Sequence, residues 1–518
     1  MKPSIFRTPD GRNHAITFAL VSSLFLLWGF CNGMIDVMDK HFQQELHLTL
    51  AQSAWVQFAH YLGYFLMAMP AGWLASKLGY KGGIIAGLLM VAVGGFWFIP
   101  ATQIATFPAF LLGVCVIASG LTFLETVANP YTTVLGPTQY AATRINLAQS
   151  CNGVGWIFGP IAGAAFFYGK DASGQSTGSE TLWIPYAAIG GFVLILAVVF
   201  AFCKLPDMKS DDEFHLDEAG PVDDKPIANR GLALVLLWLN IVVLSLAVGM
   251  IISAVVAIPA VGAKLGMTEN KALWGASGFL AALGTVVLTL KSNQIKNNSI
   301  WSHPHFSGAT LTQFFYVAAQ CGIFAYFINY MTSQIPAVPG SWSTGSFGAW
   351  FEVHKNGLLG LSDKGASSLA SVGFVCFLAG RIIGAALLKK FPAHKVLAAF
   401  AALAGLCSLA VFLKLGWLSA AALFLTYLFM SIMFPTIFSL GIHGLGSRAK
   451  EASSFIVMAI MGGAIMPKLM GHIADQTDMS TGFIVPLACF VAVALYGSVW
   501  SKLSHSESAV AIKLNSGH

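Results

Sequence analysis

Residues 23–38, SLFLLWGFCNGMIDVM, place one carboxylate, Asp36, inside a long apolar run. Residues 111–130, LLGVCVIASGLTFLETVANP, repeat this arrangement around Glu125. Burying an ionised side chain in hydrocarbon costs a few kcal/mol, so acids that persist there are usually functional. Most of the other acids lie in polar loops. The two exceptions, Asp36 and Glu125, therefore indicate the position of the functional site.

The composition predicts a membrane protein with many crossings. Hydrophobic residues make up 56% of the 518 residues and charged residues 10%, whereas a soluble domain has about 25% charged residues. An apolar helix of about 20 residues spans the hydrocarbon layer. The sequence therefore predicts an all-α polytopic protein, with about fourteen apolar spans at residues 16–39, 51–76, 82–102, 106–134, 145–168, 183–203, 231–260, 274–290, 309–333, 366–388, 394–414, 417–442, 452–474 and 480–501.

Lys and Arg concentrate in alternate loops, as at Lys77, Lys81, Lys389 and Lys390. Because basic loops stay on the cytoplasmic side, we expect both termini to be cytoplasmic and the protein to lie in the cell inner membrane. The first apolar run is too long for a signal peptide, so we expect it to remain as a helix. The net charge of +6 reflects this topology and needs no nucleic-acid partner to explain it.

Two polar interruptions organise the chain. Residues 205–230 are acidic and lack apolar periodicity, which is typical of a solvated linker. Six spans precede this stretch, and six more close the chain after an additional pair. The predicted domains are an N-terminal six-helix bundle at 1–204, a cytoplasmic acidic linker at 205–230, an inserted helix pair with its loop at 231–305, and a C-terminal six-helix bundle with its tail at 306–518.

The two halves share a weak internal repeat. Pro130, Leu135 and Gly136 in the fourth span correspond to a Pro-Leu-Gly set at 435, 440 and 441 in the second half. Parallel repeats are typical of carriers that rock two bundles around a central site. Pro and Gly are common in membrane helices, so the repeat is weak evidence when taken alone.

The two intramembrane acids have a chemistry suited to proton coupling. A carboxyl group removed from water favours its neutral form and releases its proton when water reaches it. We therefore predict that Asp36 and Glu125 couple transport to protons. The alternative is that either acid only forms a hydrogen bond to a neighbouring helix. Asp39, which is next to Lys40 and nearer the helix end, is interpreted as interfacial.

Polar side chains surround the acids at helical spacing. Asn32 lies four residues before Asp36 and Asn129 lies four after Glu125, so each amide shares a helix face with its acid. Amides donate and accept hydrogen bonds, as an array of sugar hydroxyls requires, and aromatic rings cover the apolar faces of a sugar. The predicted substrate-binding residues are Asn32, Asn129, Gln149, Asn152, Gln320 and Phe434.

Each of these residues also has a structural interpretation. The amides can be hydrogen-bonding links between helices. Apolar packing is the ordinary role of Phe434 in a chain with 39 phenylalanines. Arg381 lies about two turns before Lys389 and is interpreted as a conformational residue, not as a substrate ligand.

Seven stretches of the chain form a set of motifs in a fixed order. They are WGFCNGMIDVMDKHFQQ at 28–44, GYFLMAMPAG at 63–72, FLETVANPYTTVLGP at 123–137, RINLAQSCNG at 144–153, FPAHKVLAA at 391–399, FPTIFSLGI at 434–442 and SSFIVM at 453–458. These motifs resemble the L-fucose permease group of the major facilitator superfamily. The resemblance spans nearly the whole chain except the linker and the inserted pair. It implies the major facilitator fold with an inserted helix pair, coupling roles for Asp36 and Glu125, and sugar contacts for Gln149 and Asn152.

We therefore expect a secondary active sugar importer, an L-fucose–proton symporter that works by alternating access. Related carriers for glucose, galactose or N-acetylglucosamine tend to have an amide in place of Glu125, so the resemblance favours L-fucose. The alternatives are a symporter for one of those sugars with proton or sodium, a proton-driven drug exporter, and a sugar sensor that does not transport.

Other classes of function find no support in the sequence. The chain shows no nucleophile beside a base, no His and Cys metal spacing and no Gly-rich phosphate loop, so we expect no enzyme activity, metal or cofactor. The eight cysteines form no CxxC pair and are interpreted as small core residues. The expected partners are a sugar, a proton or sodium ion and membrane lipid, and the expected state is a monomer.

Overall fold

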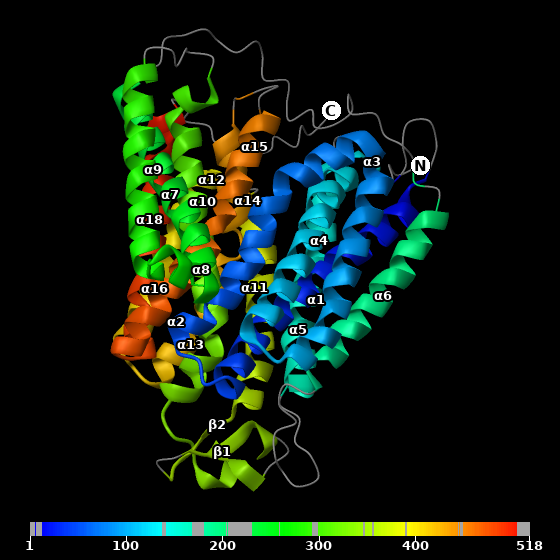
Figure 1. Cartoon of the computed structure of the whole chain (residues 1–518), viewed down its shortest axis with the longest axis vertical. Helices are drawn as coiled ribbons and strands as arrows, with labels where there is room; N and C mark the ends of the chain where they lie inside the picture. The colour runs from blue at the N-terminus through cyan, green and yellow to red at the C-terminus, as the bar shows by residue number, and fades with distance from the viewer. Residues whose placement is uncertain are drawn as a thin grey trace.

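The computed structural model describes residues 6, 13–136, 141–167, 181–203, 205, 230–257, 259–292, 299–344, 348–354, 357–388, 391–443, 445 and 449–504. The long helices run roughly along the long axis of the molecule (Figure 1). The predicted linker at 205–230 lies outside the described residues except at its two ends.

The first group of helices comes from the N-terminal part of the chain. It comprises α1 (Ala15–Glu45), α2 (Leu50–Ser53), α3 (Trp55–Ile104), α4 (Phe107–Val134), α5 (Ala141–Phe167) and α6 (Trp183–Phe202). Within the group, α1 packs against α5, and α3 packs against α4 and α6. We call this group the first bundle.

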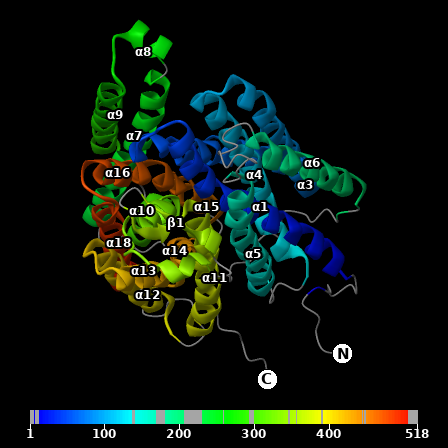
Figure 2. The same cartoon turned by 90° about the horizontal axis from the view of Figure 1, so that it is seen from below.

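A helical hairpin follows, formed by α7 (Arg230–Val256), α8 (Pro259–Leu265) and α9 (Glu269–Lys291). It stands at the side of the molecule, next to α10 (Pro304–Ser333), in both views (Figures 1 and 2). The helix α7 packs against α9, α10 and α16 (Gly462–Gln476). Most of the apolar surface of α9 is exposed, as expected for a helix that faces lipid.

The second bundle closes the chain, from α10 to the last helix. Its other elements are η5 (Ile300–Ser302), η6 (Gly340–Thr344), η7 (Gly348–Trp350), α11 (Asp363–Leu388), α12 (Ala393–Phe412), α13 (Trp417–Met430), α14 (Met433–Ile442), α15 (Ala449–Met458), η9 (Ala459–Met461), α17 (Met479–Gly482) and α18 (Ile484–Ser504). Here α10 packs against α16 and α18, while α12 packs against α13 and α18.

Most of the described residues in every predicted span are helical. Of the helices that the structure describes, twelve are long and apolar enough to cross a membrane. Of the remaining two predicted spans, 51–76 falls on α2 and α3, and 145–168 falls on α5 up to Phe167. The count of fourteen crossings stays a prediction.

Two predicted span boundaries differ from the helix boundaries in the structure. The spans at 51–76 and 82–102 merge into α3, where Gly79 makes the bend with φ 68°, a conformation that favours glycine. The span at 417–442 is divided at Ser431 and Ile432. Pro435 explains this break, because proline has no N–H to bond the carbonyl of residue 431.

Glycines set the contact between α1 and α5. A Cβ atom on Gly29 would lie 2.0 Å from the carbonyl oxygen of Asn152, and one on Gly155 would lie 2.2 Å from that of Leu26. The two backbones therefore touch without intervening side chains, which is a common mode of packing between membrane helices. This contact fixes the position of α1 and of the polar residues that it carries.

The long connection between α10 and α11 contains a small antiparallel hairpin, which the all-helical prediction missed. Its strands are β1 (Phe351–Val353) and β2 (Leu359–Leu361), and Phe351 pairs with Leu361. The turn includes Gly357 with φ 74°, and Asn-Gly at 356–357 is a strong hairpin signal. The prediction overlooked it because each strand has only three residues.

Candidate functional site

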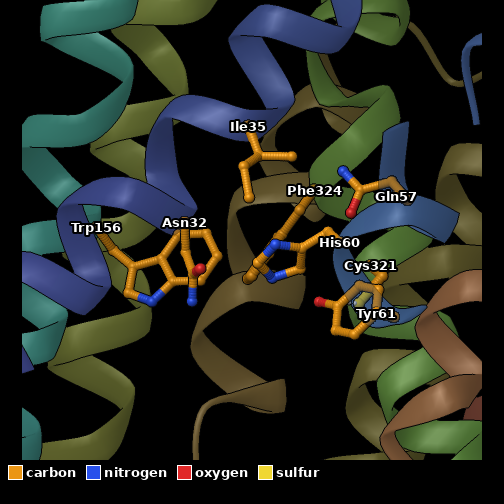
Figure 3. A pocket seen from close by; sticks show the side chains of 8 residues that line it. All are labelled: Asn32, Ile35, Gln57, His60, Tyr61, Trp156, Cys321 and Phe324. Atoms are coloured by element: carbon orange, nitrogen blue, oxygen red, sulfur yellow. Dashed lines mark hydrogen bonds between the residues drawn. The ribbon is translucent and has the colours of Figure 1, made fainter. Parts of the chain in front are cut away.

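A polar cavity lies between the two bundles, near the middle of the long helices. Its walls come from α1, α3, α5 and α10 (Figure 3). The lining residues are Asn32, Ile35, Gln57, His60, Tyr61, Trp156, Cys321 and Phe324. The cavity has room for about one water molecule in this conformation. The bundles must separate before a larger ligand can bind there.

Trp156 forms the aromatic wall of the cavity and connects the bundles. Its ring lies 5.3 Å from that of Phe324 in α10 and 4.8 Å from that of Phe374 in α11. Phe324 also packs edge-on against Phe374 and in a tilted arrangement against Tyr427. This cluster provides an apolar face of the kind that covers a sugar ring.

On the first-bundle side, the cavity connects to Glu125 through Tyr64. The indole nitrogen of Trp28 donates a hydrogen bond to the Tyr64 hydroxyl at 2.6 Å. Asn32 and the carboxyl group of Glu125 interact with the same hydroxyl. Because Asn32 also lines the cavity, a single side chain connects the acid in α4 with the space between the bundles.

His60 lies in the centre of the cavity wall (Figure 3). Only 3% of its surface is exposed, and its Nδ1 atom has no hydrogen-bond partner among the residues that the structure describes. The rings of Tyr61 and Tyr64 lie 4.9 Å and 5.1 Å from the imidazole.

The predicted site residues divide into three sets. Asn32 lines the cavity, and Glu125 is half-buried in α4 beside Tyr64. Asp36 in α1 and Asn129 in α4 have helical backbones, and their side chains lie outside the described part of the structure. The other four predicted ligands are elsewhere on the helices.

Those four residues make other contacts. The amide nitrogen of Asn152 donates to the carbonyl of Phe25 in α1 at 3.3 Å, which ties α5 to α1. The carbonyl of Gln149 accepts a hydrogen bond from Arg381. Gln320 is half-buried in α10, and the ring of Phe434 lies 6.4 Å from that of Tyr316. None of the four lines the cavity in this conformation.

Arg381 links the two bundles outside the cavity. Its Nη1 donates to the carbonyl of Gln149 at 3.2 Å, and its Nε donates to the carbonyl of Ser431 at 3.4 Å. The second carbonyl is the one that Pro435 leaves without its helical partner. The guanidinium also lies over the ring of Phe377, 4.8 Å from its centre. This bridge joins α5 to α11 and to the break between α13 and α14.

A set of polar contacts joins the bundles at the end of the molecule that holds the loop after α1. We call this the closed end, and Figure 1 shows the ribbons of the two bundles diverging toward the opposite end, where α1 begins. The contacts are Asn329 Nδ2 to Gln43 Oε1 at 2.6 Å, Tyr326 hydroxyl to Leu50 carbonyl at 2.8 Å, Leu50 N–H to Asp475 Oδ1 at 2.9 Å, and the ion pair of Lys40 with Asp363 at 3.6 Å.

The first predicted span, which ends at residue 39, stops before the end of its helix, and the interfacial position of Asp39 stays a prediction. The helix α1 continues to Glu45, and Asp39 is fully buried. Lys40 pairs with Asp363 of the second bundle. The predicted span ended at residue 39 because the apolar run ends there, whereas the helix continues through the polar residues that follow.

The sequence analysis missed the polar face of α3. Gln57, His60, Tyr61 and Tyr64 follow one another at spacings of three, one and three residues, so they share one side of the helix. Three of them line the cavity, and the fourth, Tyr64, interacts electrostatically with Glu125. This spacing is visible in the second apolar span, but histidine and tyrosine are also ordinary residues near membrane interfaces.

Comparisons with known proteins identify the fold. The family model of the Major Facilitator Superfamily matches residues 17–335, more than half of the chain. The chain belongs to this superfamily. The major facilitator fold predicted from the sequence is therefore confirmed, as is the resemblance on which that prediction was based.

Members of the superfamily with assigned substrates match this chain over almost its full length. It is 35% identical over 505 residues to the L-fucose-proton symporter of Escherichia coli (strain K12), covering 94% of this chain and 93% of that protein. It is 27% identical over 497 residues to the glucose/galactose transporter of Brucella abortus biovar 1 (strain 9-941), covering 96% of each.

Solved structures of transporters match this chain in fold. The crystal structure of the transporter FucP in the outward conformation matches with a TM-score of 0.58 and 31% identity, covering 95% of this chain and all of that one. The D-xylose-proton symporter matches with a TM-score of 0.58 at 11% identity, which is a likeness of fold alone. The protein is thus a multi-pass membrane protein of a transporter superfamily.

Proposed function

We propose that this protein is a sugar–proton symporter that imports L-fucose by alternating access. The observation that carries the proposal is the connection from Glu125 through Tyr64 to Asn32, which lines the cavity between the bundles. A titratable acid in an apolar bundle, one side chain away from a polar cavity, is the arrangement that coupling requires.

The contacts between the bundles support a rocking mechanism. The hydrogen bonds at the closed end and the Arg381 bridge hold the halves together on two sides of the cavity. All of them are polar contacts between surfaces that can also be hydrated, so breaking them has a moderate cost. The protein releases one set of contacts and forms another as the cavity changes the side to which it opens.

Proton coupling follows from the charge of the acids. When Glu125 and Asp36 are ionised, the first bundle carries charge within apolar helices, and occlusion of that charge from water is unfavourable. Protonation removes the charge, so the loaded carrier can close around sugar and proton together. The proton gradient then drives accumulation of the sugar.

The substrate assignment follows the relatives. The L-fucose-proton symporter of Escherichia coli, at 35% identity, favours L-fucose. The glucose/galactose transporter of Brucella abortus, at 27% identity, favours a hexose as the second candidate. Sodium is the alternative coupling ion, since carboxylate and amide oxygens also suit that cation.

The remaining site residues and the topology are part of the proposal. Asn129, Gln149, Asn152, Gln320 and Phe434 contact the sugar in a more open conformation, and Arg381 acts in the conformational change. The domains keep the limits 1–204, 205–230, 231–305 and 306–518. The protein lies in the cell inner membrane as a monomer with both termini in the cytoplasm.

The test is uptake of radiolabelled L-fucose into proteoliposomes under an inward proton gradient. The native chain is compared with Glu125→Gln and Asp36→Asn, and Glu352→Gln in the exposed strand β1 is the matched control. We expect accumulation by the native chain and the control, loss of accumulation in both acid variants, and sugar exchange without a gradient in at least one of them.

Two results would change the proposal in different ways. Uptake of glucose or galactose in place of L-fucose would replace the substrate and keep the mechanism. Accumulation driven only by a sodium gradient would replace the coupling ion. Full accumulation by both acid variants would contradict proton coupling through Asp36 and Glu125.

A further inference from the structure

We propose that His60 is a sugar-binding residue, which hydrogen-bonds a sugar hydroxyl and helps to select the sugar. The inference rests on the proposed function and adds to it a residue that the motifs of the sequence do not indicate. It depends on the burial of the imidazole, on its unpaired nitrogen and on its place in the cavity wall.

The first argument is burial without a partner. His60 is 97% buried, and Nδ1 makes no hydrogen bond to the part of the chain that the structure describes. Buried polar atoms in proteins almost always have a partner, so an exception calls for an explanation. In Figure 3 the ring lies in the space between Asn32, Tyr61 and Phe324, where a ligand would be placed.

The second argument is orientation. Tyr61 lies edge-on to the imidazole, with an interplanar angle of 86°, and Tyr64 lies at 53°. Two aromatic neighbours on the same helix restrict rotation of the ring. The hydrogen-bonding edge is therefore held in place before a ligand arrives, which reduces the entropy lost on binding.

The third argument is chemical complementarity. A neutral imidazole offers one donor and one acceptor, as does each sugar hydroxyl. Asn32 and Gln57 add amide groups on neighbouring parts of the wall, and Trp156 adds an apolar face. A site that hydrogen-bonds a particular hydroxyl rejects analogues that lack it more strongly than an apolar pocket rejects an extra group.

The position of His60 also connects sugar binding to the acid. Its ring contacts Tyr64, and Tyr64 interacts with Glu125. A sugar hydroxyl bonded to His60 is thus two side chains away from the proposed coupling group. The sugar and the proton therefore bind at neighbouring positions in the first bundle.

The experiment combines a protein variant with altered sugars. Binding of L-fucose, D-galactose and D-glucose to the purified protein is measured by calorimetry for the native chain and for His60→Phe. The matched control is His394→Phe, because His394 is also buried and packs against an aromatic ring, that of Trp500, but lies away from the cavity. We expect Kd for the preferred sugar to rise about 10-fold in His60→Phe and to stay unchanged in the control.

The monodeoxy derivatives of the preferred sugar then identify the contact. One derivative should bind the native chain about 10-fold more weakly than the parent sugar, yet bind His60→Phe no more weakly than the parent does. A purely structural role would make the losses multiply for every derivative, and that result would overturn the inference.

The outcomes separate the two proposals. If the native chain binds none of the three sugars, the proposed function fails and the role of His60 fails with it. If the native chain binds a sugar and His60→Phe binds it equally well, only the role of His60 fails. A weaker His60→Phe with one non-additive derivative supports both.

Discussion

Arg381 in α11 donates a hydrogen bond to the main-chain carbonyl of Gln149 in α5, 3.2 Å away. The guanidinium thus ties the second bundle to the backbone of the first, and no particular side chain is needed at position 149 for this contact. The bridge belongs to one arrangement of the bundles, since any change in their angle moves the two helices apart.

Arg381→Gln should therefore shift the conformational equilibrium. A hydrogen bond from a charged group contributes about 1.5–3 kcal/mol, so we expect a shift of roughly 10- to 100-fold away from the arrangement described above. Spectroscopic distances between labels at the closed end measure this shift. Arg230→Gln, at the exposed start of α7, is the control, and an equal shift there would contradict the bridge.

Tyr64→Phe should uncouple sugar transport from protons. The substitution removes the hydroxyl that accepts the hydrogen bond of Trp28 and interacts electrostatically with Glu125, and we expect proton-driven accumulation to fall about 10-fold with a loss of about 1 kcal/mol in stability. Uptake and thermal unfolding measure the two effects. Tyr496→Phe removes a hydroxyl bonded to the carbonyl of His305 in α10, so it should lower stability alone. A similar loss of accumulation in both variants would contradict the coupling role.

Gly29→Ala should disrupt the contact between α1 and α5. The new Cβ would lie 2.0 Å from a backbone oxygen of Asn152, and since neither backbone can move without its helix, the loss should reach or exceed about 3 kcal/mol. Gly191→Ala is the control, because a Cβ there meets nothing within 4 Å. Thermal unfolding in detergent compares them, and equal Tm values would show that the helices separate easily.

Asp478 should make one loop sensitive to acid. Partial burial alone would raise the pKa of Asp478, but hydrogen bonds from Lys414 and Thr481 outweigh it and hold that pKa below the usual carboxyl value. The folded-state pKa is thus lower than the unfolded one, so the stabilisation is present above about pH 4 and is lost as the pH falls through the folded value.

The Asp478→Asn variant tests this sign. Because the pair with Lys414 is largely exposed, its contribution is below about 1 kcal/mol. We expect the variant to unfold at a slightly lower temperature at neutral pH and at the native temperature near pH 3. A difference that grows as the pH falls would contradict the assignment.

The sequence predicted the helices well because hydropathy reports membrane crossings directly. Their ends were less certain, since the first apolar run ends at Asp39 while α1 continues to Glu45. Gly79 and Pro435 show that backbone chemistry, not hydropathy, decides where a long helix bends or breaks.

The site was harder to predict than the fold. Carboxylates stand out in an apolar sequence, so Glu125 was found, and Asn32 was found from its spacing to Asp36. His60 and Tyr64 were missed because histidine and tyrosine are ordinary residues near membrane interfaces, and only the three-dimensional position of α3 brings them to the cavity. The sequence spacing also does not show that the Asn152 side chain bonds α1, because that contact depends on how α5 packs against α1.

The hairpin of α7 and α9 changes the mechanics of the molecule. Ala247 and Met250 of α7 belong to the same buried cluster as Phe58 of the first bundle and Ile465 of the second, and Lys468 of α16 reaches both Glu269 at the start of α9 and the ring of Trp55 in α3. The hairpin therefore lies over the seam between the halves on one flank, while the opposite flank has no such cover in the described structure (Figure 2). Separation of the halves along this flank would break the shared apolar cluster and the contacts of Lys468, so the hairpin adds contacts that hold the halves together on this side.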